Sequence, residues 1–254
     1  MIMGAMASML WWPAGFCERL GKGGRFVLRY DNRDTGRSTA YNPGQAPYTI
    51  DDLAGDAVAV LDGYGIERAH LVGMSAGGVV AQLVALAYPE RLATVTAIST
   101  SAVSAPDSSL PGPDPAYLEH AASFDDLDWS DTQALGELIV QDARHLAGTR
   151  HPFDEAAARE LVERDLERAR DPRSLMNHGT LSGGEKWQGR LPEVGAPFLV
   201  IHGTADPIFP IEHGASLAEA VGAELVTIEG GGHELNEGDW DQIVDAILGH
   251  TTVR

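Results

Sequence analysis

The chain has 254 residues, 44% of them hydrophobic, a length and composition that suit one α/β domain with an insertion. It carries 37 acidic and 18 basic side chains, and the formal charge of -19 opposes binding to nucleic acid or to an anionic membrane surface. Cys17 is the only cysteine, which excludes an intrachain disulfide and a cysteine metal cluster and fits a cytoplasmic protein best.

The N-terminal stretch 1–12 is apolar enough to suggest a secretory signal. It lacks a positively charged start, however, and no convincing cleavage site follows it. Nowhere in the sequence is an apolar run long enough to span a bilayer. We therefore expect a protein that is neither secreted nor attached to a membrane.

Apolar strands alternate with amphipathic helices in the first and last parts of the chain. In the first part the expected elements are a strand end at 1–3, a helix at 9–20, a strand at 25–30, a helix at 48–63, a strand ending at 74 with its following helix, and a strand at 93–99. In the last part they are a strand at 196–203, a helix at 211–221, a strand at 224–228 and a helix at 240–248. Strands separated by helices of this length pair in parallel.

The middle of the chain, residues 101–190, contains no convincing strand. A connection rich in proline and serine, which includes Pro106, opens it. Helical stretches are predicted after this connection at 115–123, 132–146 and 153–170. We interpret 1–100 together with 191–254 as the α/β core, and the middle segment as a helical cap inserted between two strands.

The most informative stretch is the Gly-x-Ser-x-Gly sequence from Gly73 to Gly77. An apolar strand precedes it and a helix-forming run follows it, which is the context of a nucleophile elbow. A turn this tight needs residues without a Cβ at Gly73 and Gly77, and it exposes Ser75 at the end of the strand. The start of the helix aims the backbone N–H of Ala76 into the same space, as an oxyanion donor requires.

A serine hydroxyl is a poor nucleophile near neutral pH, so Ser75 needs a base and a third group that orients the base. Asp206 follows a buried-looking strand, and His233 lies in the glycine-rich turn after the last strand. Because the carboxyl ends of parallel strands meet at one edge of a sheet, we expect Ser75, Asp206 and His233 to form one site. Asp31 and Asp34 compete for the role of the acid, but they lie in a loop that we interpret as structural.

Other short patterns do not indicate a metal or a nucleotide. The histidines include no His-Glu-x-x-His spacing, and we interpret His202 as structural. The stretch 181–185 resembles the signature of ATP-binding-cassette proteins, and Gly21-Lys22 resembles part of a phosphate loop, but neither has the surrounding sequence of those motifs. We therefore expect no metal and no cofactor.

The chain resembles members of the α/β-hydrolase superfamily in the order serine, acid, histidine and in the stretches 29–39 and 61–66. Within it, the chain is similar to actinobacterial carboxylesterases related to aclacinomycin methylesterase, over nearly its whole length and most strongly outside the cap. The resemblance implies an α/β-hydrolase fold, a mostly parallel sheet flanked by helices with a helical lid. The site residues that it implies are Ser75 as nucleophile, His233 as general base, Asp206 as orienting acid, and the N–H groups of Ala5 and Ala76 as oxyanion donors.

The start of the chain departs from this family. The family sheet has two strands and most of a third before the loop that carries the second oxyanion donor, whereas 1–3 alone precede Gly4 here. Either the sequence begins late, or the protein is a trimmed variant that lacks its first strands; we favour the first explanation. Loss of a central strand would expose apolar surface and unpaired backbone and invite self-association, so we expect a monomer or a homodimer.

The substrate pocket is expected between the elbow and the cap. Side chains expected to line it, each of which would equally suit an ordinary core, are Met6, Trp11, Trp12, Met74, Phe124, Trp129, Met176, His178 and Phe209. The predicted reaction is hydrolysis of a small-molecule carboxylic ester through an acyl-enzyme intermediate. The alternatives are a lactonase, a C–C bond hydrolase or a cofactor-free perhydrolase with the same triad, and a noncatalytic ligand-binding protein of this fold.

Overall fold

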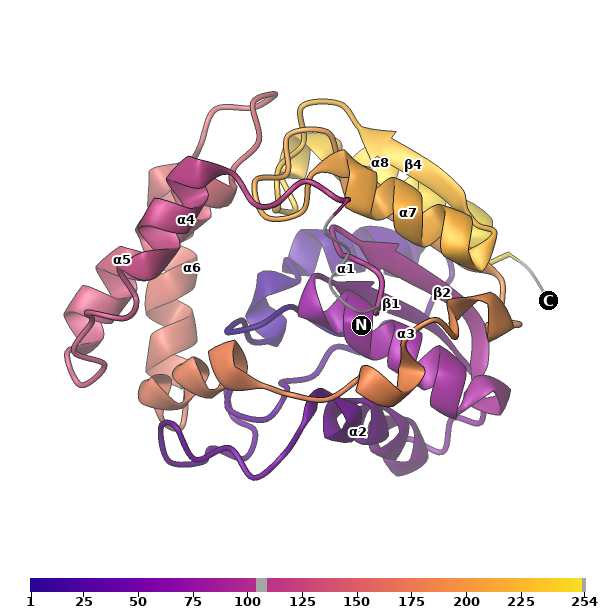
Figure 1. Cartoon of the computed structure of the whole chain (residues 1–254), viewed down its shortest axis with the longest axis horizontal. Coiled ribbons are helices and arrows are strands. Elements are labelled where there is room, and N and C mark those ends of the chain that lie inside the picture. Colours follow the sequence, from indigo (N-terminus) through magenta and orange to yellow (C-terminus); the bar gives the residue numbers. More distant parts are fainter. Residues whose placement is uncertain (104–108, 253–254) are drawn as a thin grey trace.

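The sheet at the centre of the fold contains only parallel strands (Figure 1). The structure is a computed structural model that describes residues 1–103 and 109–252. Its strands are β1 (Ala69–Met74), β2 (Leu92–Ile98), β3 (Phe198–Gly203) and β4 (Glu224–Ile228), and they lie side by side in the sheet in the same order as in the sequence. The register pairs Met74 with Ile98, Ile98 with Ile201, and Ile201 with Val226, so the carboxyl ends of the strands lie along one edge.

Helices cover both faces of this sheet and form two hydrophobic clusters with it. One face carries α2 (Ile50–Gly63), α3 (Ala76–Ala87) and α7 (Ile211–Val221), and the other carries α1 (Ala14–Lys22) and α8 (Trp240–His250). Successive strand residues point to opposite faces, so Leu71 and Val200 belong to the first cluster while Val72 and Ile201 belong to the second. Both faces of β1 and β3 are thus buried.

The described part of the segment between β2 and β3 is helical. It contains α4 (Pro115–Ala122), α5 (Thr132–Leu146), α6 (Glu155–Arg168) and the 3-10 helices Pro172–Thr180, Glu185–Trp187 and Leu191–Glu193. Aspartate side chains at 114, 131 and 154 accept backbone N–H groups at the starts of α4, α5 and α6. These three helices lie together at one side of the sheet (Figure 1), and we call the segment 109–190 the cap. Pro106 lies outside the described residues, and the division into core and cap stays our interpretation.

The predicted helices and strands from residue 48 onward are confirmed, with ends shifted by one or two residues at several places. No helix of the described residues is both long and apolar enough to cross a membrane. Two predictions in the first thirty residues are wrong. The helix expected at 9–20 is divided into a 3-10 turn (Met9–Trp11) and α1, because Pro13 fixes its own φ and has no N–H for a helical bond.

The segment 25–30 is not a strand, contrary to the prediction. A strand needs a neighbouring strand with a row of free backbone N–H and C=O groups. The segment 1–3 is too short to provide such a row. Ile2 forms one isolated bridge to Gly73, through bonds of 2.8 and 3.1 Å to the backbone of Val72 and Met74. The Met1 amino group donates to the Leu28 carbonyl at 2.7 Å, so 1–3 lies between β1 and the extended segment without completing a ladder.

The two glycines of the predicted elbow leave no room for a side chain. A Cβ on Gly73 would lie 2.1 Å from the carbonyl oxygen of Gly77, and a Cβ on Gly77 would lie 2.2 Å from that of Ile2. Strand β1, helix α3 and the N-terminal segment therefore meet with their backbones in direct contact, as the sequence pattern predicts.

Substitution of Gly73 by Ala tests this contact. Because the obstructing atoms are backbone, Gly73→Ala is expected to lower the free energy of unfolding by about 2–4 kcal/mol or to prevent folding. Gly63→Ala is the matched control, since a Cβ at this exposed end of α2 meets no atom within 4 Å. Urea denaturation followed by circular dichroism measures both; equal stability of the two variants would show that the elbow is not closely packed.

Candidate active site

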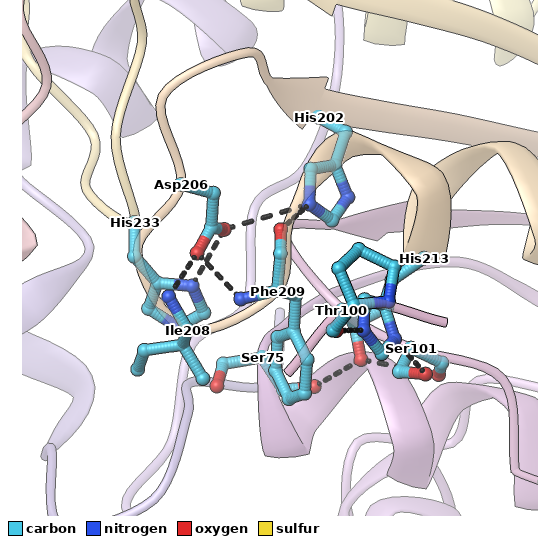
Figure 2. Close-up of polar contacts among 10 residues, drawn as sticks. Ser75, Thr100, Ser101, His202, Asp206, Ile208, Phe209, His213 and His233 are labelled. Atoms are coloured by element: carbon cyan, nitrogen blue, oxygen red, sulfur yellow. Dashed lines mark hydrogen bonds and ion pairs between the residues drawn. The ribbon is translucent and has the colours of Figure 1, made fainter. Parts of the chain in front are cut away.

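Ser75 occupies the turn between β1 and α3 in a backbone conformation that side chains rarely adopt, with φ 54° and ψ -124°. Its N–H donates to the carbonyl of Ile98 at 2.9 Å, and its own carbonyl accepts bonds of 2.8 Å from the Thr100 hydroxyl and the Gly78 N–H. These contacts to the end of β2 and to the first turn of α3 hold the strained turn in place. In Figure 2 the Ser75 hydroxyl points away from Thr100, toward the side on which His233 lies.

His233 and Asp206 come from the turns after β4 and β3 and lie in hydrogen-bond contact. The distance from His233 Nδ1 to Asp206 Oδ2 is 2.8 Å, and the two residues are only 7% and 5% exposed. The other oxygen, Oδ1, accepts the N–H groups of Ile208 and Phe209, both at 2.9 Å (Figure 2). His233 is held in turn by its own N–H, which donates to the Leu146 carbonyl at the end of α5 at 2.8 Å.

The environment of Asp206 sets the proton positions of this pair. Burial alone would raise the pKa of Asp206, but the His233 ring and the hydrogen bonds that Asp206 accepts outweigh it, and the pKa lies below its ordinary value. An ionised carboxylate can only accept, so Nδ1 of His233 carries the proton in this contact. Its Nε2 then has a free lone pair, which is what a general base needs.

Ser75 and His233 lie at the same edge of the sheet but are not hydrogen-bonded to each other. Among the described residues, neither the Ser75 hydroxyl nor His233 Nε2 has a recorded hydrogen-bond partner. Such contacts are often long without substrate and tighten only in the complex. The structure therefore brings the predicted base and acid together and leaves the serine close by without a bond.

The two residues predicted to supply oxyanion donors, Ala5 and Ala76, are neighbours in sequence of Gly4 and Ser75, and their role stays a prediction. A Cβ on Gly4 would lie 3.0 Å from the Ser75 Cβ and 3.5 Å from its Oγ, so the loop that begins at Gly4 passes directly against the serine. The N–H groups of Ala5, in this loop, and of Ala76, at the start of α3, have no recorded hydrogen-bond partner in the part of the chain that the structure describes. Unpaired N–H groups of this kind are free to bind a developing negative charge.

Comparison with known proteins places this geometry in a family. Residues 3–239 match the family described as alpha/beta hydrolase fold. The chain belongs to this family. It is 35% identical to rhodomycin D methylesterase DauP of Streptomyces sp. (strain C5) and 36% identical to rhodomycin D methylesterase DnrP of Streptomyces peucetius; each alignment covers 99% of this chain and 89% of the relative. The resemblance that the sequence suggested is thereby confirmed.

Solved structures agree on the fold of this α/β-hydrolase. The esterase EaEST from Exiguobacterium antarcticum superposes with a TM-score of 0.79 at 19% identity, and the match covers 99% of this chain and 91% of that structure. A hydrolase from Pseudomonas aeruginosa PA01 superposes with a TM-score of 0.69 at 25% identity, over 98% of this chain and 88% of that one. These structures support the α/β-hydrolase fold, and the family match with the two methylesterase relatives identifies the chain as a hydrolase.

The side chains predicted to line a pocket fall into different environments in this α/β-hydrolase. Trp12 is fully buried and Met74 nearly so, and both belong to the hydrophobic cluster formed with α1 and α8, so they are core residues and not pocket lining. The ring of Phe209, in contrast, lies 5.8 Å from that of His233 (Figure 2).

The remaining predicted lining residues divide between the cap and the loop beside Ser75. Met6, Trp11 and Met176 are partly exposed, and Phe124 packs against Trp129 with 6.1 Å between ring centroids. His178 is buried, and both of its ring nitrogens bond to backbone atoms of other segments. Its ring is thus engaged in holding the chain, which differs from the lining role that we predicted for it.

Asp31 and Asp34, the alternative acids, do not contact His233. Asp31 forms an ion pair with Arg168 of α6, with distances of 2.6 and 3.0 Å. Asp34 is buried and accepts the Tyr48 hydroxyl at 2.6 Å. Both carboxylates hold the loop together, as the sequence reading expected.

Asp142 of α5 is a residue near the site that the sequence did not reveal. Burial raises its pKa to about 6, against the opposing effect of the nearby His233. Its Oδ1 lies 3.2 Å from Nε2 of His120, whose ring stacks on that of His145 at 4.4 Å. In the sequence Asp142 is one polar residue on an amphipathic helix, and no motif distinguishes it from the solvent-facing ones.

The lowered pKa of Asp206 predicts how its contribution to stability depends on pH. Because the folded pKa lies below the ordinary 3.8, the stabilisation is complete above the unfolded pKa and is lost as pH falls through the folded one. Asp206→Asn is expected to lower the free energy of unfolding at pH 7 by about 1–3 kcal/mol, and the difference from the parent should shrink below about pH 4.

Urea denaturation at pH 7, 5 and 3.5 measures this difference. The control is Asp245→Asn, an exposed carboxyl on α8, which should change stability little at any of these pH values. A difference between parent and Asp206→Asn that stays constant, or that grows toward low pH, would contradict an ionised, hydrogen-bonded Asp206.

Proposed function

We propose that this α/β-hydrolase cleaves carboxylic esters by acyl transfer, with Ser75 as the nucleophile, His233 as the general base and Asp206 as the acid that orients it. The observation that carries the proposal is the 2.8 Å contact between buried His233 and Asp206 at the same sheet edge as the elbow serine. The similarity over the full chain to two rhodomycin D methylesterases favours an ester as the substrate.

The reaction proceeds in two halves. In the first, Ser75 Oγ attacks the ester carbonyl carbon while His233 Nε2 takes the hydroxyl proton, and the carbonyl electron pair moves onto an oxygen that the N–H groups of Ala5 and Ala76 bind. The intermediate collapses, the C–O bond to the alcohol breaks, and the alcohol leaves with the proton from His233. In the second half, His233 takes a proton from a water whose oxygen attacks the acyl carbon; the bond from this carbon to Ser75 Oγ then breaks, His233 returns the proton to Oγ, and the acid is released. Asp206 stabilises the imidazolium throughout.

The proposed substrate class is an alkyl ester of a largely apolar acid, with a methyl ester as the first choice. The names of the two Streptomyces relatives support the methyl group. The ring of Phe209 next to His233, and the aromatic pair Phe124 and Trp129 in the cap, supply apolar contacts of the kind that an aromatic or aliphatic acyl group prefers.

Replacement of the nucleophile tests the proposal. Ser75→Ala should lower kcat for p-nitrophenyl acetate by about 10⁴-fold or more, because the covalent step is lost. The parent should also be labelled at Ser75 by a fluorophosphonate, as mass spectrometry of the peptides would show. Ser101→Ala is the control: Ser101 follows the neighbouring strand, and its hydroxyl is 2.9 Å from His213 and not part of the proposed triad.

Circular dichroism and thermal melting would establish that Ser75→Ala folds. A Ser75→Ala protein that still hydrolyses the ester would exclude Ser75 as the nucleophile. A folded parent that neither hydrolyses esters nor reacts with the fluorophosphonate would instead support a noncatalytic protein of this fold.

A further inference from the structure

The loop that carries Ala5 continues into a segment that side chains from the cap hold at several points. The first is Met6, whose N–H donates to Nδ1 of His178 at 2.9 Å, across 172 positions of sequence. Met6 has a φ of 59°, a value that a residue with a side chain adopts only at a cost. A specific partner at this N–H stabilises that conformation directly after Ala5.

The His178 ring is arranged to serve as such a partner. It is 8% exposed and lies in the 3-10 helix Pro172–Thr180. Nε2 lies 2.7 Å from the Arg33 carbonyl oxygen, which can only accept, so Nε2 carries the proton and Nδ1 is left to accept the Met6 N–H. Burial lowers the pKa of His178, which keeps the ring in this neutral form. The ring thus fixes two backbone segments relative to each other.

A second cap residue, Asp165 of α6, holds the same loop further along. Its Oδ2 accepts the indole N–H of Trp11 at 2.7 Å and lies 3.5 Å from the N–H of Ser8. Asp165 is 8% exposed, so this contact is shielded from water. Arg168, one turn later on α6, pairs with Asp31, which also accepts the Met9 N–H at 3.0 Å.

We propose that His178 and Asp165 are positioning residues for the oxyanion hole: through Met6, Ser8 and Trp11 they place the N–H of Ala5 beside Ser75. The inference rests on the proposed ester hydrolysis. It follows from the path of the chain. Gly4 lies against Ser75, Ala5 is the next residue, and the residue after it, Met6, is hydrogen-bonded to His178 of the cap. Oxyanion donors act only within a narrow range of distance, so a loop free to move by an ångström loses much of their effect. The cap is then part of the catalytic framework.

The experiment compares variants that remove or keep the acceptor at position 178. His178→Leu removes it, and His178→Asn keeps an oxygen able to accept the Met6 N–H. We expect kcat of His178→Leu on p-nitrophenyl acetate to fall by about 10- to 100-fold with KM changed less than about twofold, and His178→Asn to regain most of the loss. The concentration of active enzyme is set by fluorophosphonate titration, so that partial unfolding does not count as lost kcat.

Two further variants complete the design. Asp165→Ala should show the same fall in kcat at nearly constant KM, and it tests the proposal on its own if His178→Leu does not fold. Trp187→Phe removes a 2.8 Å bond between the indole N–H and Asp51 of α2, a contact of similar kind that does not involve the loop. Its kcat should equal that of the parent.

An unchanged kcat in His178→Leu or in Asp165→Ala would overturn the inference. So would a raised KM at constant kcat, which indicates that the residue lines the pocket. The third contrary result is a kcat that falls as far in His178→Asn as in His178→Leu. Hydrogen exchange provides a readout independent of activity. Peptides covering 4–11 should exchange faster in His178→Leu than in the parent, and equal exchange would refute the role in positioning. A parent protein that does not hydrolyse esters, or a Ser75→Ala variant that still does, would refute the proposed function. The hydrogen-exchange comparison would then decide by itself whether His178 positions the loop.

Discussion

The contact on which this structure depends is the meeting of three backbones at Gly73 and Gly77. Strand β1 and helix α3 approach so closely there that only glycine fits, and the carbonyl of Ile2 packs against Gly77 from the other side. The same contact therefore positions both Ser75 and the N-terminal segment that runs from Ile2 to Gly4. Gly4 in turn lies against the serine. Ser75 and the loop that begins at Gly4 are placed by one packing constraint, and neither can shift without the other.

The parallel sheet supplies the rest of the site by aligning strand ends. Asp206 and His233 follow β3 and β4, and the register brings them to the edge where Ser75 stands. Asp206 is distinguished from other buried carboxyls by its donors. Burial raises the pKa of Asp142, whereas the His233 ring and the hydrogen bond from the Phe209 N–H outweigh burial and lower that of Asp206. The acid that we propose to orient His233 must stay ionised, and these donors favour the ionised form of Asp206.

The sequence was sufficient where a single local rule decides the structure. The elbow glycines, the helices and strands from residue 48 onward, and the order of Ser75, Asp206 and His233 all follow from spacing and residue type. It failed where a neighbour decides. The segment 25–30 has the composition of a strand but lacks a partner to pair with among the described residues, and Trp12 has the composition of a pocket residue but is fully buried and stacks on Phe16 of α1. Side-chain direction and pairing partners are properties of the assembled fold, and composition alone does not contain them.

His178 illustrates this difference most clearly. The sequence indicated that this residue lies near the site, but it did not predict the hydrogen bonds that the ring forms with backbone atoms. An imidazole near a site is as compatible with a pocket wall as with a structural bond, and only the partners of its two nitrogens decide between them. Here both partners are backbone groups, one of them at the residue after Ala5. His233 is also held by a cap carbonyl, that of Leu146, so the cap contacts both His233 and the loop that carries Ala5. Movement of the cap would therefore alter the positions of both His233 and this loop, which couples the cap to two parts of the site that we propose.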